Sequence, residues 1–326
     1  MNPNDDFIAK IGFGLAVGHS TDEEGGTGCT VVRGVSEPLR ASAFVFGRAT
    51  GTRESALLEP WASNDRVDAI LLTGGSAYGL DAAAGVMTWM EERGRGFPIA
   101  GGVVPIVPAA VVFDLAPLGR FAARPTAAMA YRACDEAAPR GWAEGSVGAG
   151  TGCTVGKALG HARAMKGGFG VGLAGAGELG PQGVYACALS VVNALGHVRG
   201  EDGKIIAGPR KDDGTLMDSE ALTMLGELFG GPGAHTTLSV VALNRAFSKS
   251  ELHQIARAAS AAHARRIGPS GTSFDGDIVF AVCAREGALP GPLVPAEVAA
   301  TGAVEQAIVR AVRCAKGRDG VPGLAD

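Results

Sequence analysis

The residue types around Thr236 allow a reaction that cleaves the backbone. The chain passes from the glycine- and proline-rich segment 230–233 through His235 to Thr236, where an apolar strand pattern begins. A hydroxyl in that position can attack the preceding carbonyl, so that the peptide becomes an ester whose hydrolysis frees a terminal amine. That amine, with a pKa of about 8, can accept the proton of its own hydroxyl near neutral pH. From this segment alone, a threonine that simply starts a strand is the more economical interpretation.

A pair of acids is the second chemical feature. Asp275 and Asp277 are separated by one glycine and directly precede an apolar strand pattern over residues 278–283. A spacing of two residues in extended backbone directs both carboxylates to one face. Carboxylates beside apolar neighbours are costly unless a cation or hydrogen-bond donors stabilise them. A plain turn and a calcium loop are the alternatives, and a calcium loop needs more oxygen ligands than this segment offers.

Two glycine-rich segments resemble nucleotide-binding motifs without meeting their requirements. Residues 170–175 match the Gly-x-Gly-x-x-Gly fingerprint, but that motif needs a strand before it and a helix after it, and glycines flank this one on both sides. Residues 152–158 are one residue short of a phosphate-binding loop, and Ala158 replaces the hydroxyl that would bind magnesium. We therefore expect no nucleotide cofactor. Lys157, placed by these glycines, is a candidate for electrostatic tuning of a site.

Composition and charge narrow the class of partner. Of the 326 residues 46% are apolar, enough for a closed core, and a net charge of −4 leaves no basic face for nucleic acid. The acidic start lacks the order of a secretory signal, and the most apolar stretch, 103–113, is short and contains two prolines. We therefore expect a cytoplasmic protein without a membrane anchor. The six cysteines lack metal-ligand spacing and are predicted to be reduced thiols, so no metal is expected and the partner is a small molecule.

Strand and helix patterns alternate along the chain. The strand patterns cover residues 29–33, 43–46, 69–73, 111–113, 184–192, 237–243 and 278–283. The helix patterns cover residues 81–92, 126–136, 249–267 after a capping box formed by Ser248 and Glu251, and 296–314. Asn193 directly follows one of the strands, and residues 200–235 form the candidate linker. These elements predict one compact α/β unit over residues 1–326.

Five motifs follow one another along the chain: Gly74-Gly75-Ser76-Ala77-Tyr78-Gly79-Leu80, Gly156-Lys157, Val191-Val192-Asn193, Thr236-Thr237 and Phe274-Asp275-Gly276-Asp277. In this order they resemble the motifs of the self-processing N-terminal-nucleophile aminopeptidase and amidase family. That family includes L-aminopeptidase/D-esterase enzymes, β-peptidyl aminopeptidases and endo-type 6-aminohexanoate-oligomer (nylon oligomer) hydrolases. The acid pair at 275 and 277 looks more like the nylon-oligomer branch than the aminopeptidase branch, where a serine and a glutamate are usual.

The resemblance implies a role for each catalytic candidate. It makes Thr236 the nucleophile and Asn193 a hydrogen-bond donor on the oxyanion side. It makes Lys157 a charge near the nucleophile that keeps the new amine neutral. It makes Asp275 and Asp277 the acids that orient the amine and the hydroxyl.

The resemblance also assigns Tyr78 and Phe113 to substrate binding. Phe113 stands where the nylon-oligomer enzymes have a tyrosine, so any hydroxyl contact made there is missing. His235 departs from the asparagine or glycine that usually precedes the nucleophile. The five other histidines are interpreted as surface or satisfied core residues.

The fold and the activity follow from the same resemblance. It implies a layered α-β-β-α sandwich, cleaved between His235 and Thr236 into an α part, 1–235, and a β part, 236–326, that stay together. It implies hydrolysis of short linear amides without a metal or organic cofactor, and a homo-oligomer, with a tetramer as one possibility. The alternatives are an aminopeptidase or D-esterase on small peptides, an acyl transferase of the ornithine-acetyltransferase kind, and an uncleaved glycine-rich binding protein.

Overall fold

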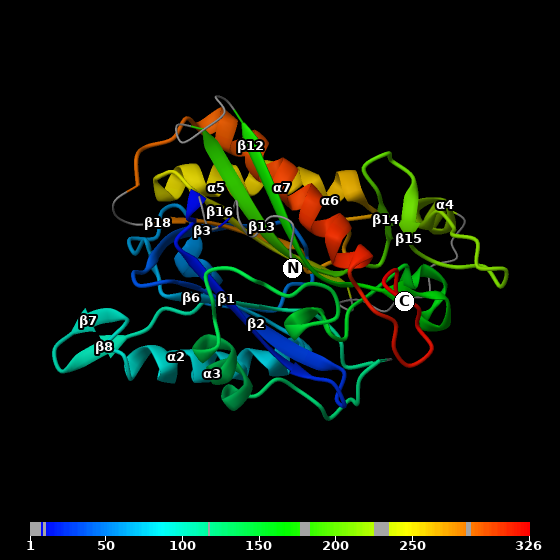
Figure 1. Cartoon of the computed structure of the whole chain (residues 1–326), viewed down its shortest axis with the longest axis horizontal. Coiled ribbons are helices and arrows are strands. Elements are labelled where there is room, and N and C mark those ends of the chain that lie inside the picture. The colour runs from blue at the N-terminus through cyan, green and yellow to red at the C-terminus, as the bar shows by residue number, and fades with distance from the viewer. Residues whose placement is uncertain (1–7, 9–10, 117, 177–182, 225–234, 285–287) are drawn as a thin grey trace.

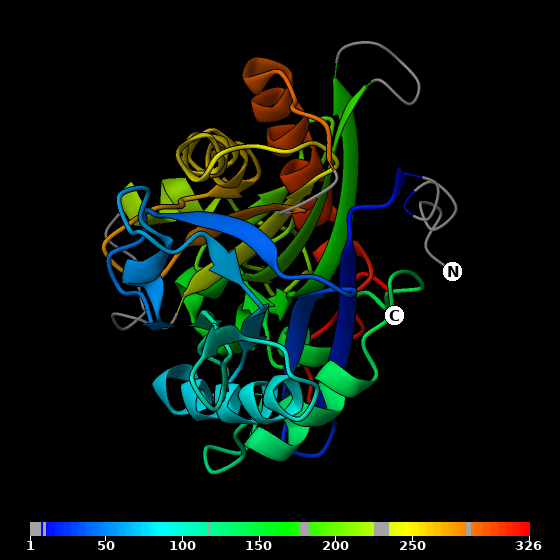
Figure 2. The ribbon, with the colours of Figure 1, turned by 90° about the vertical axis from the view of Figure 1, so that its left-hand side faces the viewer.

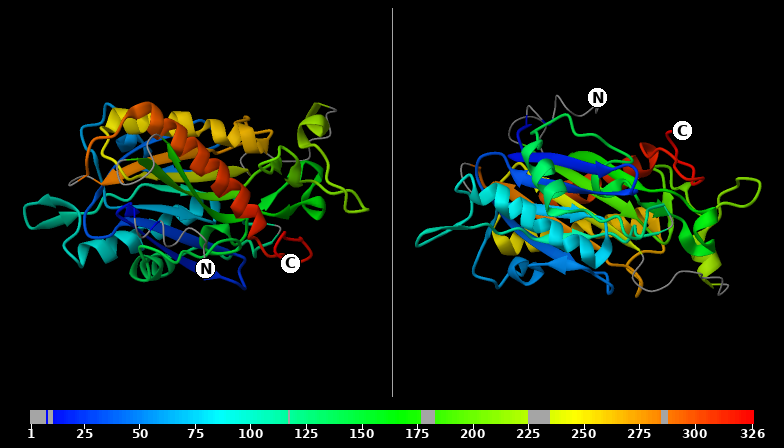
Figure 3. Two further views of the ribbon diagram at one scale, coloured as in Figure 1. Left: turned by 45° about the horizontal axis from the view of Figure 1, so that its top comes forward. Right: turned by 90° about the horizontal axis from the view of Figure 1, so that it is seen from below.

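The apolar stretches form two stacked β-sheets in the computed structural model, which describes residues 8, 11–116, 118–176, 183–224, 235–284 and 288–326 (Figure 1). Helices cover the outer face of each sheet, as the views from the side and from below show (Figures 2 and 3). The layers therefore follow the order α-β-β-α, and the predicted sandwich is confirmed.

The larger sheet carries the candidate nucleophile in one of its central strands. All its neighbouring strands are antiparallel except β16 and β18, which run parallel. In spatial order its strands are β12 (Gly168–Ala176), β13 (Val184–Asn193), β16 (Thr236–Leu243), β18 (Ile278–Ala284), β3 (Leu39–Val45) and β5 (Arg66–Val67).

The smaller sheet and the remaining short strands complete the β-structure. The smaller sheet consists, in spatial order, of β1 (Leu15–Asp22), β2 (Thr27–Gly34), β6 (Ala69–Thr73), β9 (Ala109–Val111) and β4 (Thr52–Arg53). Three minor sheets contain β7 (Phe97–Ile99) with β8 (Gly102–Val104), β10 (Thr154–Val155) with β11 (Met165–Lys166), and β15 (Ile205–Ala207), β14 (His197–Arg199) and β17 (Ile267–Gly268).

The helices divide between the two outer layers. Helices α2 (Ala83–Glu91) and α3 (Ala127–Asp135) pack on the smaller sheet, and α5 (Lys249–Ala259), α6 (Ala261–Arg266) and α7 (Leu293–Arg313) pack on the larger one. The short helices are α4 (Ser219–Met224) and the 3₁₀ turns η1 (Ser55–Leu58), η2 (Ser76–Ala82), η3 (Gly148–Gly150), η4 (Lys157–Leu159) and η5 (His161–Arg163).

Alternation along the buried strands builds the layers. In β16, Leu238 and Val240 face the smaller sheet, whereas Val241 and Leu243 face the helices α5 and α7. All eight residues of β16 are buried, because both faces of this strand are covered. The strand therefore holds Thr236 in a fixed backbone position at its first residue.

The fingerprint-like glycines of residues 170–175 have a packing role. They lie within β12, which continues to Ala176, whereas that motif needs a helix that begins at its glycines. A Cβ at Gly170 would lie 2.2 Å from the carbonyl oxygen of Ala307, and one at Gly172 would lie 2.0 Å from that of Ala303. The glycines therefore allow the backbone of α7 to lie directly on the strand.

Most predicted elements exist, with shifted boundaries. The pattern 81–92 begins as the 3₁₀ turn η2 before α2, and the helix expected after Ser248 divides at Ser260 into α5 and α6. The capping box of Ser248 and Glu251 is confirmed. The candidate linker contains β15 and α4, whereas its segment 230–233 lies outside the described residues.

The structure also bears on the cysteines and on membrane insertion. All six cysteines are free thiols, and five of them are buried. Among the helices of the described ranges, none has both the length and the apolar character needed to cross a bilayer.

Candidate active site

Thr236 lies at one end of the ladder between β13 and β16 of the larger sheet. It is the first residue of β16 and pairs with Asn193, the last residue of β13. Its side chain lines a cavity of about 320 Å³, formed also by Ala49, Thr50, Gly51, Ser76, Ala77, Val111 and Phe113. The hydroxyl oxygen Oγ1 lies 2.7 Å from the carbonyl oxygen of His235. The predicted nucleophile thus faces a cavity and is next to the carbonyl that it would attack.

The backbone of Gly276 lies close to both the carbonyl of His235 and the hydroxyl of Thr236. Its N–H donates to the carbonyl oxygen of His235 at 2.9 Å. A Cβ at position 276 would lie 2.7 Å from Thr236 Oγ1 and 2.8 Å from the carbonyl oxygen of Ala49. The glycine between the two acids therefore permits a close approach that a side chain would block. Gly276 was not among the predicted site residues, although a glycine between two acids at the start of a strand could have indicated a close backbone contact there.

The two acids are buried beside this backbone. Asp277 Oδ1 accepts the N–H of Thr237 at 2.7 Å, and Asp275 Oδ2 accepts the N–H of Thr272 at 2.7 Å. Burial raises the pKa of Asp275 to about 6, and the negative charge of Asp277 acts in the same direction. Strand β18 begins at Ile278, and an isolated parallel bridge between His235 and Asp275 continues the register of the β16–β18 ladder back to the acids.

Lys157 and Asn193 form a buried pair on the other side of Thr236. Lys157 Nζ donates to the backbone oxygen of Asn193 at 3.0 Å and to its side-chain oxygen at 2.8 Å. That side-chain oxygen also accepts the N–H of Thr154 at 3.0 Å. Two donors therefore fix the orientation of the amide, whose nitrogen donates to the carbonyl oxygen of Phe113 at 2.9 Å. Burial lowers the pKa of Lys157 to about 7.

The two candidate substrate-binding residues lie in different surroundings. Phe113 lines the cavity, whereas Tyr78 is 53% exposed, lies under the Arg124 guanidinium at 3.5 Å, and is not among the residues that line the cavity. Ser76, from the same glycine-rich motif as Tyr78, does line it and has a φ of 51°. Its N–H donates to the carbonyl oxygen of Val112 at 3.0 Å, which holds this turn beside the cavity.

The buried carboxylate of Asp114 forms a hydrogen bond to that turn. Asp114 Oδ1 accepts the N–H of Gly75 at 2.6 Å, and Oδ2 accepts the hydroxyl of Thr27 at 2.6 Å. Burial raises the pKa of Asp114 to about 6, whereas these hydrogen bonds act in the opposite direction. The sequence analysis did not select Asp114, because its partners are distant in the chain.

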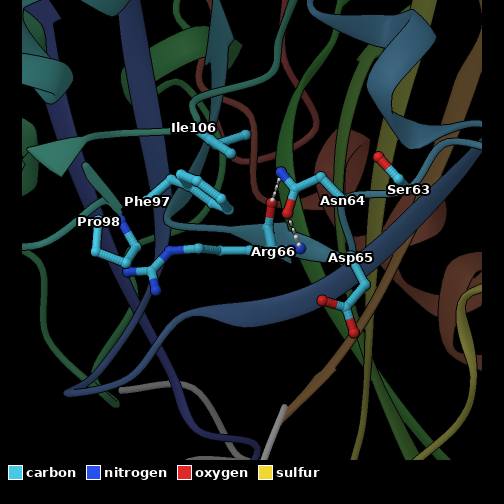
Figure 4. Close-up of a pocket in the computed structure, with 7 residues that line it drawn as sticks. All are labelled: Ser63, Asn64, Asp65, Arg66, Phe97, Pro98 and Ile106. Atoms are coloured by element: carbon cyan, nitrogen blue, oxygen red, sulfur yellow. Dashed lines mark hydrogen bonds between the residues drawn. The ribbon is translucent and has the colours of Figure 1, made fainter. Parts of the chain in front are cut away.

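A larger pocket of about 690 Å³ lies elsewhere, beside the β7–β8 hairpin (Figure 4). It is lined by Ser63, Asn64, Asp65, Arg66, Phe97, Pro98 and Ile106. Arg66 is paired with Asp68 at 2.8 Å, and none of the predicted site residues lines this pocket. Its size alone does not make it the better candidate.

One group of side chains in the described part of the chain has the composition of a metal site. It consists of His197, Asp218 and Glu220, none of which is a predicted site residue. Arg199 pairs with Asp218 at 3.5 Å and with Glu220 at 3.0 Å, and His197 Nδ1 accepts the N–H of Ser219 at 3.0 Å. An arginine therefore already forms ion pairs with both acids.

Comparisons with known proteins identify a family and relatives to which the chain is similar. The family model described as peptidase family S58 matches residues 13–325. An uncharacterized aminopeptidase of Mycobacterium tuberculosis is 39% identical over 306 residues, which cover 87% of this chain and 83% of the relative. A 6-aminohexanoate-oligomer endohydrolase of Kocuria sp. is 31% identical over 291 residues, which cover 85% of this chain and 75% of the relative.

Solved structures show the same fold. The L-aminopeptidase D-Ala-esterase/amidase of Ochrobactrum anthropi, described as a variant of the Ntn hydrolase fold, superposes with a TM-score of 0.69 at 21% identity. That match covers 96% of this chain and 89% of the other. A β-aminopeptidase of Burkholderia sp. superposes with a TM-score of 0.67 at 20% identity, covering 96% and 87%.

Proposed function

The chain belongs to peptidase family S58, and from this membership and the site geometry we propose a self-processing amide hydrolase with Thr236 as its N-terminal nucleophile. The observation that carries the proposal is the position of Thr236, which lines a cavity and whose hydroxyl lies 2.7 Å from the carbonyl oxygen of His235. That oxygen also accepts the N–H of Gly276 at 2.9 Å. A nucleophile, an electrophile and a donor for an oxyanion are therefore side by side.

Self-cleavage would proceed as an acyl shift from nitrogen to oxygen. Thr236 Oγ1 forms a bond to the carbonyl carbon of His235, the bond from that carbon to the Thr236 nitrogen breaks, and the hydroxyl proton ends on this nitrogen. The N–H of Gly276 stabilises the negative charge that develops on the carbonyl oxygen. Water then hydrolyses the ester, which leaves a carboxylate on His235 and a free amine and hydroxyl on Thr236.

In turnover the freed amine of Thr236 acts as the base for its own hydroxyl. Thr236 Oγ1 attacks the carbonyl carbon of the substrate amide, the leaving nitrogen receives the proton, and water hydrolyses the acyl ester. Asn193 donates its amide N–H to the oxyanion, an interaction worth about 3 kcal/mol in rate. When protonated, Lys157 keeps the amine neutral by lowering its pKa. Asp275 and Asp277 orient the first residues of β16.

The cavity supports a neutral linear amide as the substrate. Its lining side chains, as far as the structure describes them, are small, hydroxylic or apolar, and none of them is an acid or a base that ionises at neutral pH. A volume of about 320 Å³ accepts a short segment of chain. Similarity to 6-aminohexanoate-oligomer endohydrolases favours the same substrate class, short linear amides of the nylon-oligomer type.

Aminopeptidase activity is the second candidate, because the similar mycobacterial proteins carry that name. Pairs of amides that differ only in a free or an acylated amine on the acyl side distinguish the two. Equal or faster hydrolysis of the acylated member supports the amidase, whereas strict dependence on the free amine supports the aminopeptidase. Release of acid without transfer to an added amine acceptor argues against the acyl transferase.

Intact mass of the purified protein tests the nucleophile. The wild-type chain should give two fragments, 1–235 and 236–326, and Thr236→Ala a single inactive chain. Thr88→Ala, an exposed threonine on α2, is the matched control and should be cleaved like the wild type. A wild-type protein that hydrolyses amides as one uncut chain refutes the mechanism. The homo-oligomer stays a prediction, which light scattering after size-exclusion chromatography tests.

A further inference from the structure

A buried histidine connects one acid of the candidate site to the helix layer. His263 lies on α6, which covers the larger sheet beside α5 (Figure 1), and its side chain is fully buried. Its ring packs edge-on against Phe46, with ring centres 5.1 Å apart. A fully buried imidazole is costly unless its nitrogens have polar neighbours. The two nitrogens of His263 have different neighbours, and both lead to the strands of the site.

The nitrogen Nε2 contacts a pair of serines within the sheet. It lies 3.1 Å from the hydroxyl oxygen of Ser239, which in turn lies 2.9 Å from the hydroxyl oxygen of Ser190. Ser239 is on β16 and Ser190 is opposite it on β13. If Ser239 donates to Nε2, the ring carries its proton on Nδ1. In that arrangement Nδ1 is the donor of the His263 ring.

The nitrogen Nδ1 faces the acid at the start of β18. It lies 3.8 Å from Asp277 Oδ2, and both side chains are almost completely buried. The other oxygen of this carboxylate, Oδ1, accepts the N–H of Thr237 at 2.7 Å. The 3.8 Å separation exceeds a hydrogen bond, so the contact in the uncleaved chain is electrostatic. Asp277 is thus between the histidine and the backbone that directly follows Thr236.

We propose that His263 is a positioning residue, which holds the Asp277 carboxylate against the N–H of Thr237 and thereby fixes Thr236 at the candidate site. The inference rests on the proposed function, because it assigns importance to the placement of Thr236. His263 is not among the residues that line the cavity and acts through Asp277. An N–H on Nδ1 attracts Oδ2 of Asp277 and so favours the orientation in which Oδ1 accepts from Thr237. Small displacements of a nucleophile reduce rates strongly.

Two amide side chains separate the functions of the two ring nitrogens. His263→Asn places an amide near the position of Nδ1, where it can face Asp277, and His263→Gln places one near the position of Nε2, where it can face Ser239. His263→Leu removes both polar contacts at similar volume. Ser239→Ala removes the far partner without touching Asp277. All four variants are compared with the wild-type full chain.

The readouts are the extent of self-cleavage by intact mass, kcat and KM on a linear amide, and the midpoint of thermal unfolding. His263→Asn should keep kcat within about threefold of the wild type, whereas His263→Gln and His263→Leu should lower kcat by about tenfold to a hundredfold at unchanged KM. Ser239→Ala should lower kcat less than His263→Leu.

The outcomes separate this inference from the proposed function. Equal kcat in the Asn, Gln and Leu variants, or losses that only follow the unfolding midpoint, overturn the role of His263 while leaving Thr236 as the nucleophile. A wild-type chain that is active without being cut before Thr236 refutes the proposed function, and the positioning role falls with it.

Discussion

Alanine at position 276 would test whether the close approach of the backbone to Thr236 is needed for self-cleavage. Its Cβ would lie 2.7 Å from Thr236 Oγ1 and 2.8 Å from the carbonyl oxygen of Ala49, both shorter than real Cβ contacts. The Ala49 atom belongs to the backbone and cannot rotate away. The hydroxyl of Thr236 can, and its rotation would move it from the carbonyl of His235.

The size of the effect follows from the same distances. Ordinary contact begins at 3.4 Å, so Thr236 Oγ1 would have to move by about 0.7 Å from its position at 2.7 Å. A misplacement of about 1 Å costs on the order of a hundredfold in rate, so Gly276→Ala should slow self-cleavage by about tenfold to a hundredfold. Alanine keeps the N–H that donates to His235, so the loss reports crowding of the hydroxyl. The free energy of unfolding should fall by about 1–3 kcal/mol.

The assay is a time course of intact mass on freshly synthesised protein, with thermal unfolding measured in parallel. Gly102→Ala is the matched control, because a Cβ there would meet nothing within 4 Å. It should be cleaved at the wild-type rate. A folded Gly276→Ala protein that is cleaved as fast as the wild type refutes the reasoning, since the hydroxyl would then tolerate the methyl group.

Four further predictions follow from the same structure. Asn193→Ala should lower kcat of the processed enzyme by about a hundredfold to a thousandfold through loss of an oxyanion donor, and steady-state kinetics that place the loss in KM alone would contradict that role. Activity should decline below about pH 6, because burial and the charge of Asp277 raise the pKa of Asp275 to about 6. Protonation of Asp275 then removes the charge that orients the nucleophile. A kcat/KM profile that stays flat well below pH 6 would contradict this role of Asp275. The pKa of Asp275 is about 6 in the folded chain and 3.8 in the unfolded chain, so the folded chain binds this proton more tightly. The contribution of Asp275 to the free energy of unfolding therefore grows as the pH falls through 6 and is complete below 3.8. Urea titrations at several pH values can measure this change. Gly172→Ala should lower the free energy of unfolding by about 1–3 kcal/mol, because its Cβ would lie 2.0 Å from the carbonyl oxygen of Ala303, and an unchanged urea midpoint would argue against close packing of α7 on β12.

Local patterns in the sequence were sufficient for the strands that carry the site. Strands β13 and β16 are long apolar runs, so their ends, Asn193 and Thr236, were predictable to within one residue. The capping box at Ser248 likewise depends only on neighbouring residues. The helix boundaries near Ser76 and Ser260 shifted because 3₁₀ turns and helix breaks depend on packing against other elements.

Contacts between residues that are distant in the chain could not be predicted from the sequence. The role of Gly276 depends on the carbonyl of His235, and that of Asp114 on the N–H of Gly75. His263 was interpreted as a surface or satisfied core residue, and its position opposite Asp277 exists only once α6 is folded onto the sheet. Residue type and spacing identify such groups as candidates, whereas the topology of the fold determines which residues they contact.

The direction of one strand explains how three separate motifs meet. Because β18 runs parallel to β16, the acids before Ile278 lie beside the start of β16; an antiparallel β18 of seven residues would place them about 20 Å away, at the other end of the strand. The antiparallel β13 brings its last residue, Asn193, to the same point. A cut before Thr236 would leave β16 and β18 hydrogen-bonded between β13 and β3, which belong to the other fragment. The fragment that carries the new amine would therefore contribute the two central strands of the sheet, and their backbone ladders on both sides would hold the amine in place after the peptide bond is broken.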